Sequence, residues 1–344
     1  MNKNRLISVL LIALLPLGLM ITSACGKGNN LHLESDETYT DNSYNNALFS
    51  HGNMVYADGK LYYNFTPNNI TGILAQGTYC ITDNSKERVQ DFGITLYPSV
   101  PTLGIFQGKL FMPVANEDIS QIYPVFKDFS SDVKFTVSEN ALYFYVGSKV
   151  YISKDGIHSE TLFDKANEIG DMSPCYITEK SITYLSVNGH LKEYDFKKQE
   201  FIIDEELSKY DIHVEDKYNL IDYTFVKPLK CGDKTLLFAD QTSKDFRLYD
   251  VSDGFKLLYT REYTNREASG GDDFCSYNVC GSNVYISNIA KGIDKIDLTT
   301  GRVTNLVPEN TNDICIFGDK WVYYFSGDTV FRTSQDGMTT EKVS

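Results

Sequence analysis

"WVYYFSGDTVFRTSQDG" runs from Trp321 to Gly337, and "ALYFYVGSKVYISKDG" runs from Ala141 to Gly156. Each stretch contains an aromatic strand, a tight turn, a second strand and an Asp-Gly turn. Short apolar segments separated by Gly, Asn and Asp are typical of antiparallel β-hairpins. Because the same pattern occurs twice, far apart in one chain, the sequence predicts a fold built from repeated hairpin units.

A search along the chain finds seven hairpin patterns, each with an apolar strand, a short polar turn and a second strand, mostly aromatic. They are Met54–Phe65, Leu103–Val114, Phe135–Val146, Cys175–Ser186, Pro228–Ala239, Tyr277–Asn288 and Cys315–Ser326. Equivalent turn positions lie 32 to 53 residues apart. Such a period, with about four strands per unit, is typical of a β-propeller. We therefore predict an all-β propeller over residues 50–344 with seven four-stranded blades, and six or eight blades are the alternatives.

Helices are not expected to contribute much to this domain. Only two segments, 160–169 and 202–212, come near a helical spacing of apolar residues, and each predicts at most a short helical turn. The chain has 24 Tyr and 20 Phe against one Trp and nine Pro, a composition that favours strands.

Residues 1–24 have the features of a cleaved signal peptide. Lys3 and Arg5 precede an apolar run from Leu6 to Ile21, which is too short and too interrupted for a membrane span. Residues 25–49 are polar and lack apolar periodicity, so they predict a flexible tether.

The sequence Thr22-Ser23-Ala24-Cys25 resembles a bacterial lipobox. In that motif the cysteine receives a diacylglycerol, and Thr22 departs from the usual leucine. The alternative is an ordinary secretory signal with an incidental cysteine. A chain acylated at Cys25 would stay anchored, since each buried methylene contributes about 0.8 kcal/mol. We expect an extracytoplasmic protein, lipid-anchored to the bacterial cell membrane.

The charge of the chain argues against nucleic acid as a partner. The formal net charge is −14, and it becomes −16 once Lys3 and Arg5 are removed. Such a surface repels phosphate backbones.

No catalytic, metal-binding or cofactor-binding constellation stands out in the sequence. The five histidines are scattered, and no paired Cys-x-x-Cys, nucleophile-elbow or phosphate-loop motif occurs. Ser153–Gly156 and Ser334–Gly337 invite comparison with the Asp-box of sialidase-type propellers, but both lack its spacing, so we interpret them as turns. We predict no cofactor and no metal, and the sequence favours a protein that is not an enzyme.

Six cysteines follow Cys25, too few for a disulfide scaffold in a domain of this size. Cys175 and Cys315 occupy equivalent positions in two repeats and are predicted to be packed as small apolar side chains. Cys275 and Cys280 are close enough in sequence for pairing to stay an alternative.

The predicted topology places the long segments at one end of the propeller. Within a blade, the turns between first and second strands and between third and fourth strands share an end and are short. The long segments join strands at the opposite end, where binding residues on a rigid scaffold are commonly found. Candidate binding residues on this face are Asn64, Asn69, Tyr97, Tyr210, Tyr218, Tyr223, Tyr263, Asp272 and Asp273.

Residues 58–65, 142–156 and 318–337 carry repeats of the type Gly-x-apolar-Tyr-Tyr followed by Asp-Gly. In this respect the chain resembles bacterial lipoproteins that carry a domain of unknown function related to the low-density-lipoprotein-receptor-type propeller. The receptor signature Tyr-Trp-Thr-Asp is absent. The resemblance covers roughly residues 50–344 and implies the fold and a surface location, but no activity.

These features lead us to expect a binding propeller for a protein, peptide or glycan. The alternatives are a glycosidase or lyase, which would need two carboxylates about 5–10 Å apart across a cleft, and an accessory or sensor subunit of an envelope complex.

Overall fold

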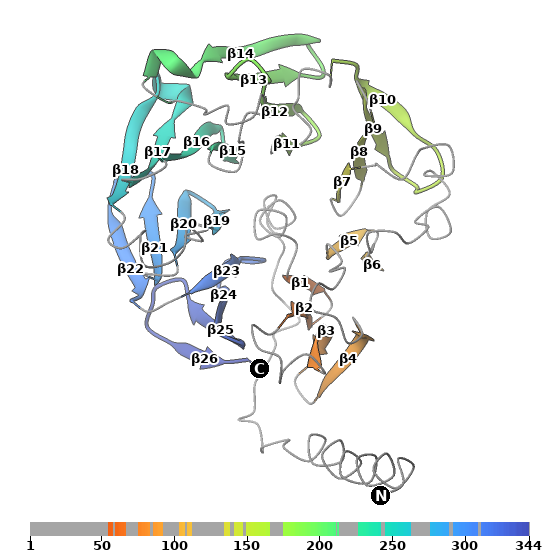
Figure 1. Ribbon diagram of the computed structural model, residues 1–344, viewed down its shortest axis with the longest axis vertical. Coiled ribbons are helices and arrows are strands. Elements are labelled where there is room, and N and C mark those ends of the chain that lie inside the picture. The colour runs from red at the N-terminus through yellow and green to blue at the C-terminus, as the bar shows by residue number, and fades with distance from the viewer. Residues whose placement is uncertain are drawn as a thin grey trace, which may run out of the picture.

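The computed structural model describes residues 54–57, 59–66, 75–82, 85–91, 103–106, 109–111, 134–137, 141–146, 149–165, 175–210, 212, 226–241, 245–262, 276–288, 292–308 and 311–343. The predicted signal peptide, Cys25 and the predicted tether lie outside these residues. Most of the described chain is β-strand, and Figure 1 shows the sheets arranged as blades around a common centre. The fold is therefore an all-β propeller, as the hairpin repeats predict.

Six sheets have four antiparallel strands each, paired in chain order. Blade 1 is β1 (Met54–Ala57), β2 (Lys60–Phe65), β3 (Gly77–Ile81) and β4 (Lys86–Asp91). Blade 2 is β7 (Lys134–Val137), β8 (Leu142–Val146), β9 (Lys149–Ser153) and β10 (Glu160–Phe163). Blade 3 is β11 (Cys175–Ile177), β12 (Ser181–Leu185), β13 (His190–Asp195) and β14 (Glu200–Glu206).

Blade 4 is β15 (Val226–Cys231), β16 (Lys234–Gln241), β17 (Asp245–Asp250) and β18 (Lys256–Glu262). Blade 5 is β19 (Ser276–Cys280), β20 (Asn283–Asn288), β21 (Gly292–Asp297) and β22 (Val303–Val307). Blade 6 is β23 (Asn312–Cys315), β24 (Trp321–Ser326), β25 (Thr329–Ser334) and β26 (Thr340–Lys342). Two short 3-10 helices, η5 (Leu207–Tyr210) and η7 (Val251–Asp253), follow β14 and β17.

The seventh predicted hairpin forms a two-stranded sheet, β5 (Gly104–Phe106) with β6 (Lys109–Phe111). It lies between blades 1 and 2 in Figure 1, and β5 contacts both β1 and β7. The prediction of seven four-stranded blades is therefore wrong, and the alternative of six is confirmed. All seven hairpins exist, but this one has only two strands among the described residues, because residues 112–133 fall outside them.

The core of the protein lies between blades, because each sheet presents side chains to the neighbour on either side. Every residue of β12 is buried, whereas β4 is almost entirely exposed. Alternate side chains of an inner strand point to opposite faces of its sheet, so an inner strand needs apolar residues on both faces. This requirement accounts for aromatic strands such as "WVYYFS" at Trp321–Ser326.

Blade 1 and blade 6, the first and the last blade of the described chain, lie side by side, and side chains join them there. Tyr56 stacks on Phe317 at a centroid distance of 5.9 Å, and Tyr63 meets Phe325 edge-on at 5.9 Å. The Cys315 thiol donates to the Met54 carbonyl at 3.7 Å. We call this blade 6 to blade 1 interface the seam, because no sheet among the described strands combines strands of the first and the last blade.

A β-bulge interrupts the pairing of third and fourth strands in five of the six four-stranded sheets. In each case one residue of the outermost strand is skipped; these residues are Val89, Leu162, Ile202, Leu258 and Leu306. A bulge bends and twists a strand, so the outer edges of these blades are poor templates for pairing with another chain.

Strand direction defines two ends of the ring. At the turn end, strands one and two and strands three and four of each blade are joined by short turns, such as residues 232–233 in blade 4. The connections between blades, such as residues 207–225 and 263–275, join strand ends at the other end. We call this second end the connection end.

Candidate functional site

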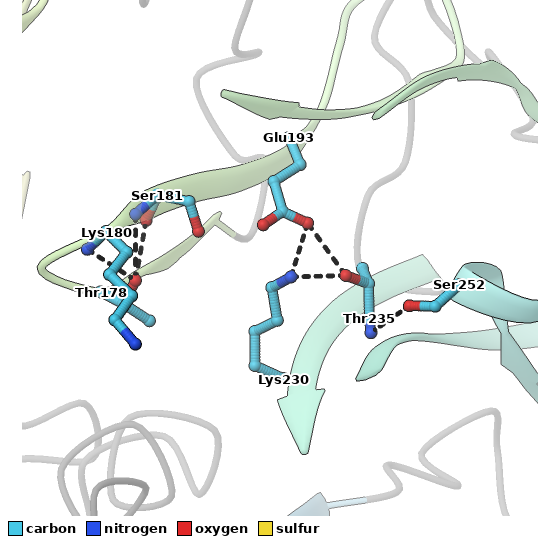
Figure 2. A network of polar contacts seen from close by, with 7 residues as sticks. All are labelled: Thr178, Lys180, Ser181, Glu193, Lys230, Thr235 and Ser252. Atoms are coloured by element: carbon cyan, nitrogen blue, oxygen red, sulfur yellow. Dashed lines mark hydrogen bonds and ion pairs between the residues drawn. The ribbon is translucent and has the colours of Figure 1, made fainter. Parts of the chain in front are cut away.

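A charged cluster joins blades 3 and 4. Glu193 on β13 accepts hydrogen bonds at Oε2 from Lys230 Nζ at 2.6 Å and from Thr235 Oγ1 at 2.9 Å (Figure 2). Lys230 Nζ also lies 2.5 Å from Thr235 Oγ1. Because Lys230 and Thr235 are directly paired across β15 and β16, they present one face to Glu193. The Glu193 side chain is 3% exposed and that of Lys230 17% exposed, so the cluster braces two blades from within.

The turn beside this cluster is held by its own hydrogen bonds. The Thr178 hydroxyl accepts from the backbone N–H groups of Lys180 and Ser181, each at 3.1 Å, as Figure 2 shows. In blade 4, the Ser252 hydroxyl accepts from the Thr235 N–H at 2.8 Å. The Ser252 contact fixes the backbone that carries Thr235, and the Thr178 contacts fix the turn between β11 and β12.

A second ionic cluster joins blades 4 and 5. Arg261 Nη1 lies 3.2 Å from Asp294 Oδ2, and Asp294 also accepts from the Tyr259 hydroxyl and from Asn305 Nδ2 at 2.8 Å. Arg261 Nη1 has no well-aligned hydrogen bond, so the contact with Asp294 is chiefly electrostatic. Both charged side chains are largely buried.

A third buried carboxylate, Asp250, lies within blade 4. Its Oδ2 accepts from Lys234 Nζ at 2.5 Å, and this hydrogen bond is the main cause that raises the pKa of Lys234. Glu193, Asp294 and Asp250 are thus each engaged by a basic side chain. Paired in this way, these carboxylates are suited to joining strands and blades rather than to transferring protons across a cleft.

The two Ser-x-Asp-Gly segments form turns, as the sequence analysis interprets them. The Asp155 carboxylate accepts from the backbone N–H groups of Ile157 and His158, each at 2.8 Å. Asp336 accepts from the Ser334 hydroxyl at 2.6 Å and from the Met338 N–H at 2.9 Å. Both carboxylates are therefore occupied by their own turns.

Acid is expected to weaken these turns. The Ser334 hydroxyl and then the Met338 N–H lower the pKa of Asp336. A pKa that is lower in the folded state adds stability above the unfolded value, and this stability is lost as pH falls through the folded value. The midpoint temperature of unfolding should therefore decrease as the pH is lowered from about 5 to about 2. Asp336→Asn should make this decrease slightly smaller. An acid dependence identical in the two proteins would contradict this assignment.

Two cysteines repeat one inter-blade contact at the turn end. The Cys231 thiol donates to the Gly281 carbonyl of blade 5 at 3.1 Å. The Cys280 thiol donates to the Gly318 carbonyl of blade 6 at 3.4 Å. Cys80, Cys231, Cys280 and Cys315 are buried and form no disulfide, so the packing predicted for Cys315 is confirmed. The Cys175 side chain and Cys275 lie outside the described residues.

The thiol of Cys231 should be unreactive in the folded protein. Burial, with a smaller contribution from Cys280, raises its pKa to about 11 from 9.0. At pH 8 its thiolate fraction should be on the order of 100-fold below that of an ordinary thiol. Iodoacetamide labelling followed by peptide mass spectrometry should leave Cys231 unmodified until guanidinium is added. Rapid labelling without denaturant would contradict the buried contact.

Two of the predicted binding residues fall within the described chain. Asn64 lies in β2, where it is buried and accepts from the Thr78 hydroxyl at 2.9 Å. Tyr210 ends η5 and stacks on Phe255 at a centroid distance of 3.7 Å. The structure does not bring these two together, since they belong to blade 1 and to the connection after blade 3. The others, Asn69, Tyr97, Tyr218, Tyr223, Tyr263, Asp272 and Asp273, lie outside the described residues.

The described residues show neither a metal-ligand cluster nor a membrane-spanning helix. They contain no group of three His, Cys, Asp or Glu side chains placed to hold a metal ion. Within the same part of the chain, no helix has the length and apolar character to cross a membrane.

Comparison with known proteins gives a likeness in fold. No family model matches the chain, and no curated protein matches it. Among solved structures, it is similar to Hsv2 from Kluyvelomyces marxianus, with a TM-score of 0.39 and 10% sequence identity. The likeness covers 59% of this chain and 60% of that one, less than two thirds of either. The class of the protein, an all-β propeller, follows from its own sheet topology.

Proposed function

We propose that this chain is a non-enzymatic binding propeller, anchored outside the cytoplasm through a lipid on Cys25. Its ligand would be a protein, peptide or glycan bound at the connection end, and nucleic acid is not expected. The lipobox-like sequence Thr22–Cys25 and the likeness of the repeats to lipoproteins with a receptor-type propeller domain support the anchor.

One observation carries the binding role: the ring is a braced scaffold whose longer connections all join strands at the same end. Residues 207–225 and 263–275 connect blades there, whereas two residues separate β15 from β16 at the turn end. Long segments on a rigid frame can vary in sequence without loss of the fold, which is the usual basis of binding by loops. The engagement of Glu193, Asp250 and Asp294 in ion pairs favours binding over hydrolysis.

Capture by immobilised ligands tests the binding role directly. Residues 26–344 would be applied to arrays of glycans and of cell-envelope proteins. The matched control is a chain in which residues 213–223 are replaced by a short Gly-Ser linker. We expect a ligand that the control chain fails to capture. Turnover of a defined substrate, abolished by one substitution at the connection end, would instead establish an enzyme.

The anchor is tested separately in cells. Metabolic labelling with an alkyne fatty acid should mark the wild-type chain, and Cys25→Ala should remove both the label and the membrane association. Label that persists in the Cys25→Ala chain would rule out the lipobox assignment.

A further inference from the structure

Three blades carry an Asp-Gly turn followed by an apolar residue before the fourth strand, and blade 4 differs from the other two. Ile157 in blade 2 is 55% exposed and Met338 in blade 6 is 84% exposed, whereas Phe255 in blade 4 is 7% exposed. The shared Asp-Gly pair is therefore followed by an exposed apolar residue in two blades and by a buried one in blade 4, whose turn also contains η7. Something specific to blade 4 must cover Phe255.

The backbone of Phe255 is also unusual. Its φ is 58°, and the preceding Gly254 has φ 66°. Among the described residues only Gln199 and Asp313 share a positive φ without being glycine. A bulky residue disfavours this region because its Cβ crowds the carbonyl that follows. Phe255 holds the conformation because contacts of its ring offset that cost.

The cover comes from the connection that leaves blade 3. Tyr210 stacks on Phe255 with ring centroids 3.7 Å apart and planes inclined by 14°. The Tyr210 hydroxyl donates to Glu205 at 3.3 Å, which restricts the ring from its other end.

The residues on either side of Tyr210 are held as well. Leu207 and Ile212 are completely or almost completely buried, and they share an apolar cluster with Leu237 and Tyr249 of blade 4. The Leu207 N–H donates to the Gly189 carbonyl at 3.1 Å, and the Ile212 N–H donates to the Leu207 carbonyl at 3.3 Å. Leu207–Tyr210 and Ile212 therefore lie along the neighbouring blade.

We propose that Tyr210 and Phe255 form a clamp with which blade 4 positions the connection leaving blade 3. Both are positioning residues, because together they fix where the connection starts. The left-handed backbone conformation of Phe255 directs its ring toward that of Tyr210. The clamp stands independently of any ligand. Its consequence for binding, that blade 4 presents the rest of the connection to a ligand, rests on the proposed function.

Limited proteolysis with trypsin tests the clamp, because exposed Lys209 directly precedes Tyr210 in η5. Tyr210→Ala and Phe255→Ala should each raise the initial rate of cleavage after Lys209 by about tenfold, the factor that corresponds to a stacking contact of about 1.4 kcal/mol. Tyr210→Phe keeps the ring and should be cleaved at nearly the wild-type rate. Phe255→Gly relaxes the backbone but removes the ring, so it should be cleaved as fast as Phe255→Ala. Met338→Ala is the matched control and should change nothing.

The same digests separate a clamp from a general loss of stability. A clamp variant should speed cleavage after Lys209 while tryptic sites in the other blades keep their rates, whereas global unfolding would speed them all together. Unchanged cleavage after Lys209 in both alanine variants, or an equal rise at every site, would overturn the proposal. If the arrays yield a ligand, the alanine variants should weaken its capture. Faster cleavage with unaltered capture would support the clamp but would show that this connection does not contribute to ligand binding.

Discussion

Replacing Lys230 by methionine is expected to lower the free energy of unfolding by about 3–5 kcal/mol. The ammonium group lies 2.6 Å from Glu193, whose side chain is almost fully enclosed between blades 3 and 4. Without Lys230 the carboxylate stays buried and lacks its countercharge, which costs far more than the intact pair contributes. Equilibrium unfolding in urea, followed by tyrosine fluorescence or circular dichroism, measures the change.

The partner variants make this expectation specific. Glu193→Leu should cost less, because Lys230 is the more exposed of the two and can turn its ammonium group to water. The double variant should be more stable than Lys230→Met, since it removes both charges from the interface. Lys256→Met, at an exposed lysine of the same blade, is the control and should be nearly neutral. A Lys230→Met protein within about 1 kcal/mol of wild type would show that Glu193 is not confined as described.

Replacing Phe317 by alanine is expected to destabilise the protein by about 3–5 kcal/mol. Phe317 is buried in the seam, with its ring centroid 5.9 Å from that of Tyr56 and 5.5 Å from that of Tyr323. The substitution opens a cavity at the interface between the first and last blades of the ring. Thermal unfolding should show a large drop in midpoint.

The position of the damage is as informative as its size. Hydrogen exchange in Phe317→Ala should rise first in blades 1 and 6, because the described strands of these two blades are not paired with one another and the Phe317 ring lies in the apolar cluster between them. Val303→Ala removes methyl groups from an exposed site and should leave both midpoint and exchange unchanged. Uniformly raised exchange in all blades would mean that the seam is no weaker than the other interfaces.

The hairpins and the all-β class were predictable because their signals are local. An apolar strand, a Gly or Asn turn and an aromatic strand lie within 12 residues in "YNVCGSNVYISN", Tyr277–Asn288, and the structure pairs Cys280 with Asn283 there. The blade count was harder, because it depends on whether a hairpin acquires two further strands. The hairpin at Gly104–Phe111 has the same pattern as the rest, yet it stands in a two-stranded sheet.

Contacts between blades were not predictable, since they depend on which side chains face one another across a gap. Glu193 and Lys230 are 37 residues apart and nothing local connects them. A weak signal did exist: the first strand of blade 4 reads VKPLKC, and a lysine buried between blades is rarely left without a charged partner. The repeated Cys-Gly at 231–232 and 280–281 also marks the shared inter-blade thiol contact.

In the part of the chain that the structure describes, each sheet of this ring is made from one continuous stretch of chain, and the seam brings β1 against blade 6. No described sheet therefore depends on which blade comes first along the chain. A circular permutant that joins the present ends by a linker and begins at another blade connection would still contain whole blades. For the same reason the chain could have grown by duplication of a complete hairpin pair, with no strand left to be shared between the newest unit and the oldest.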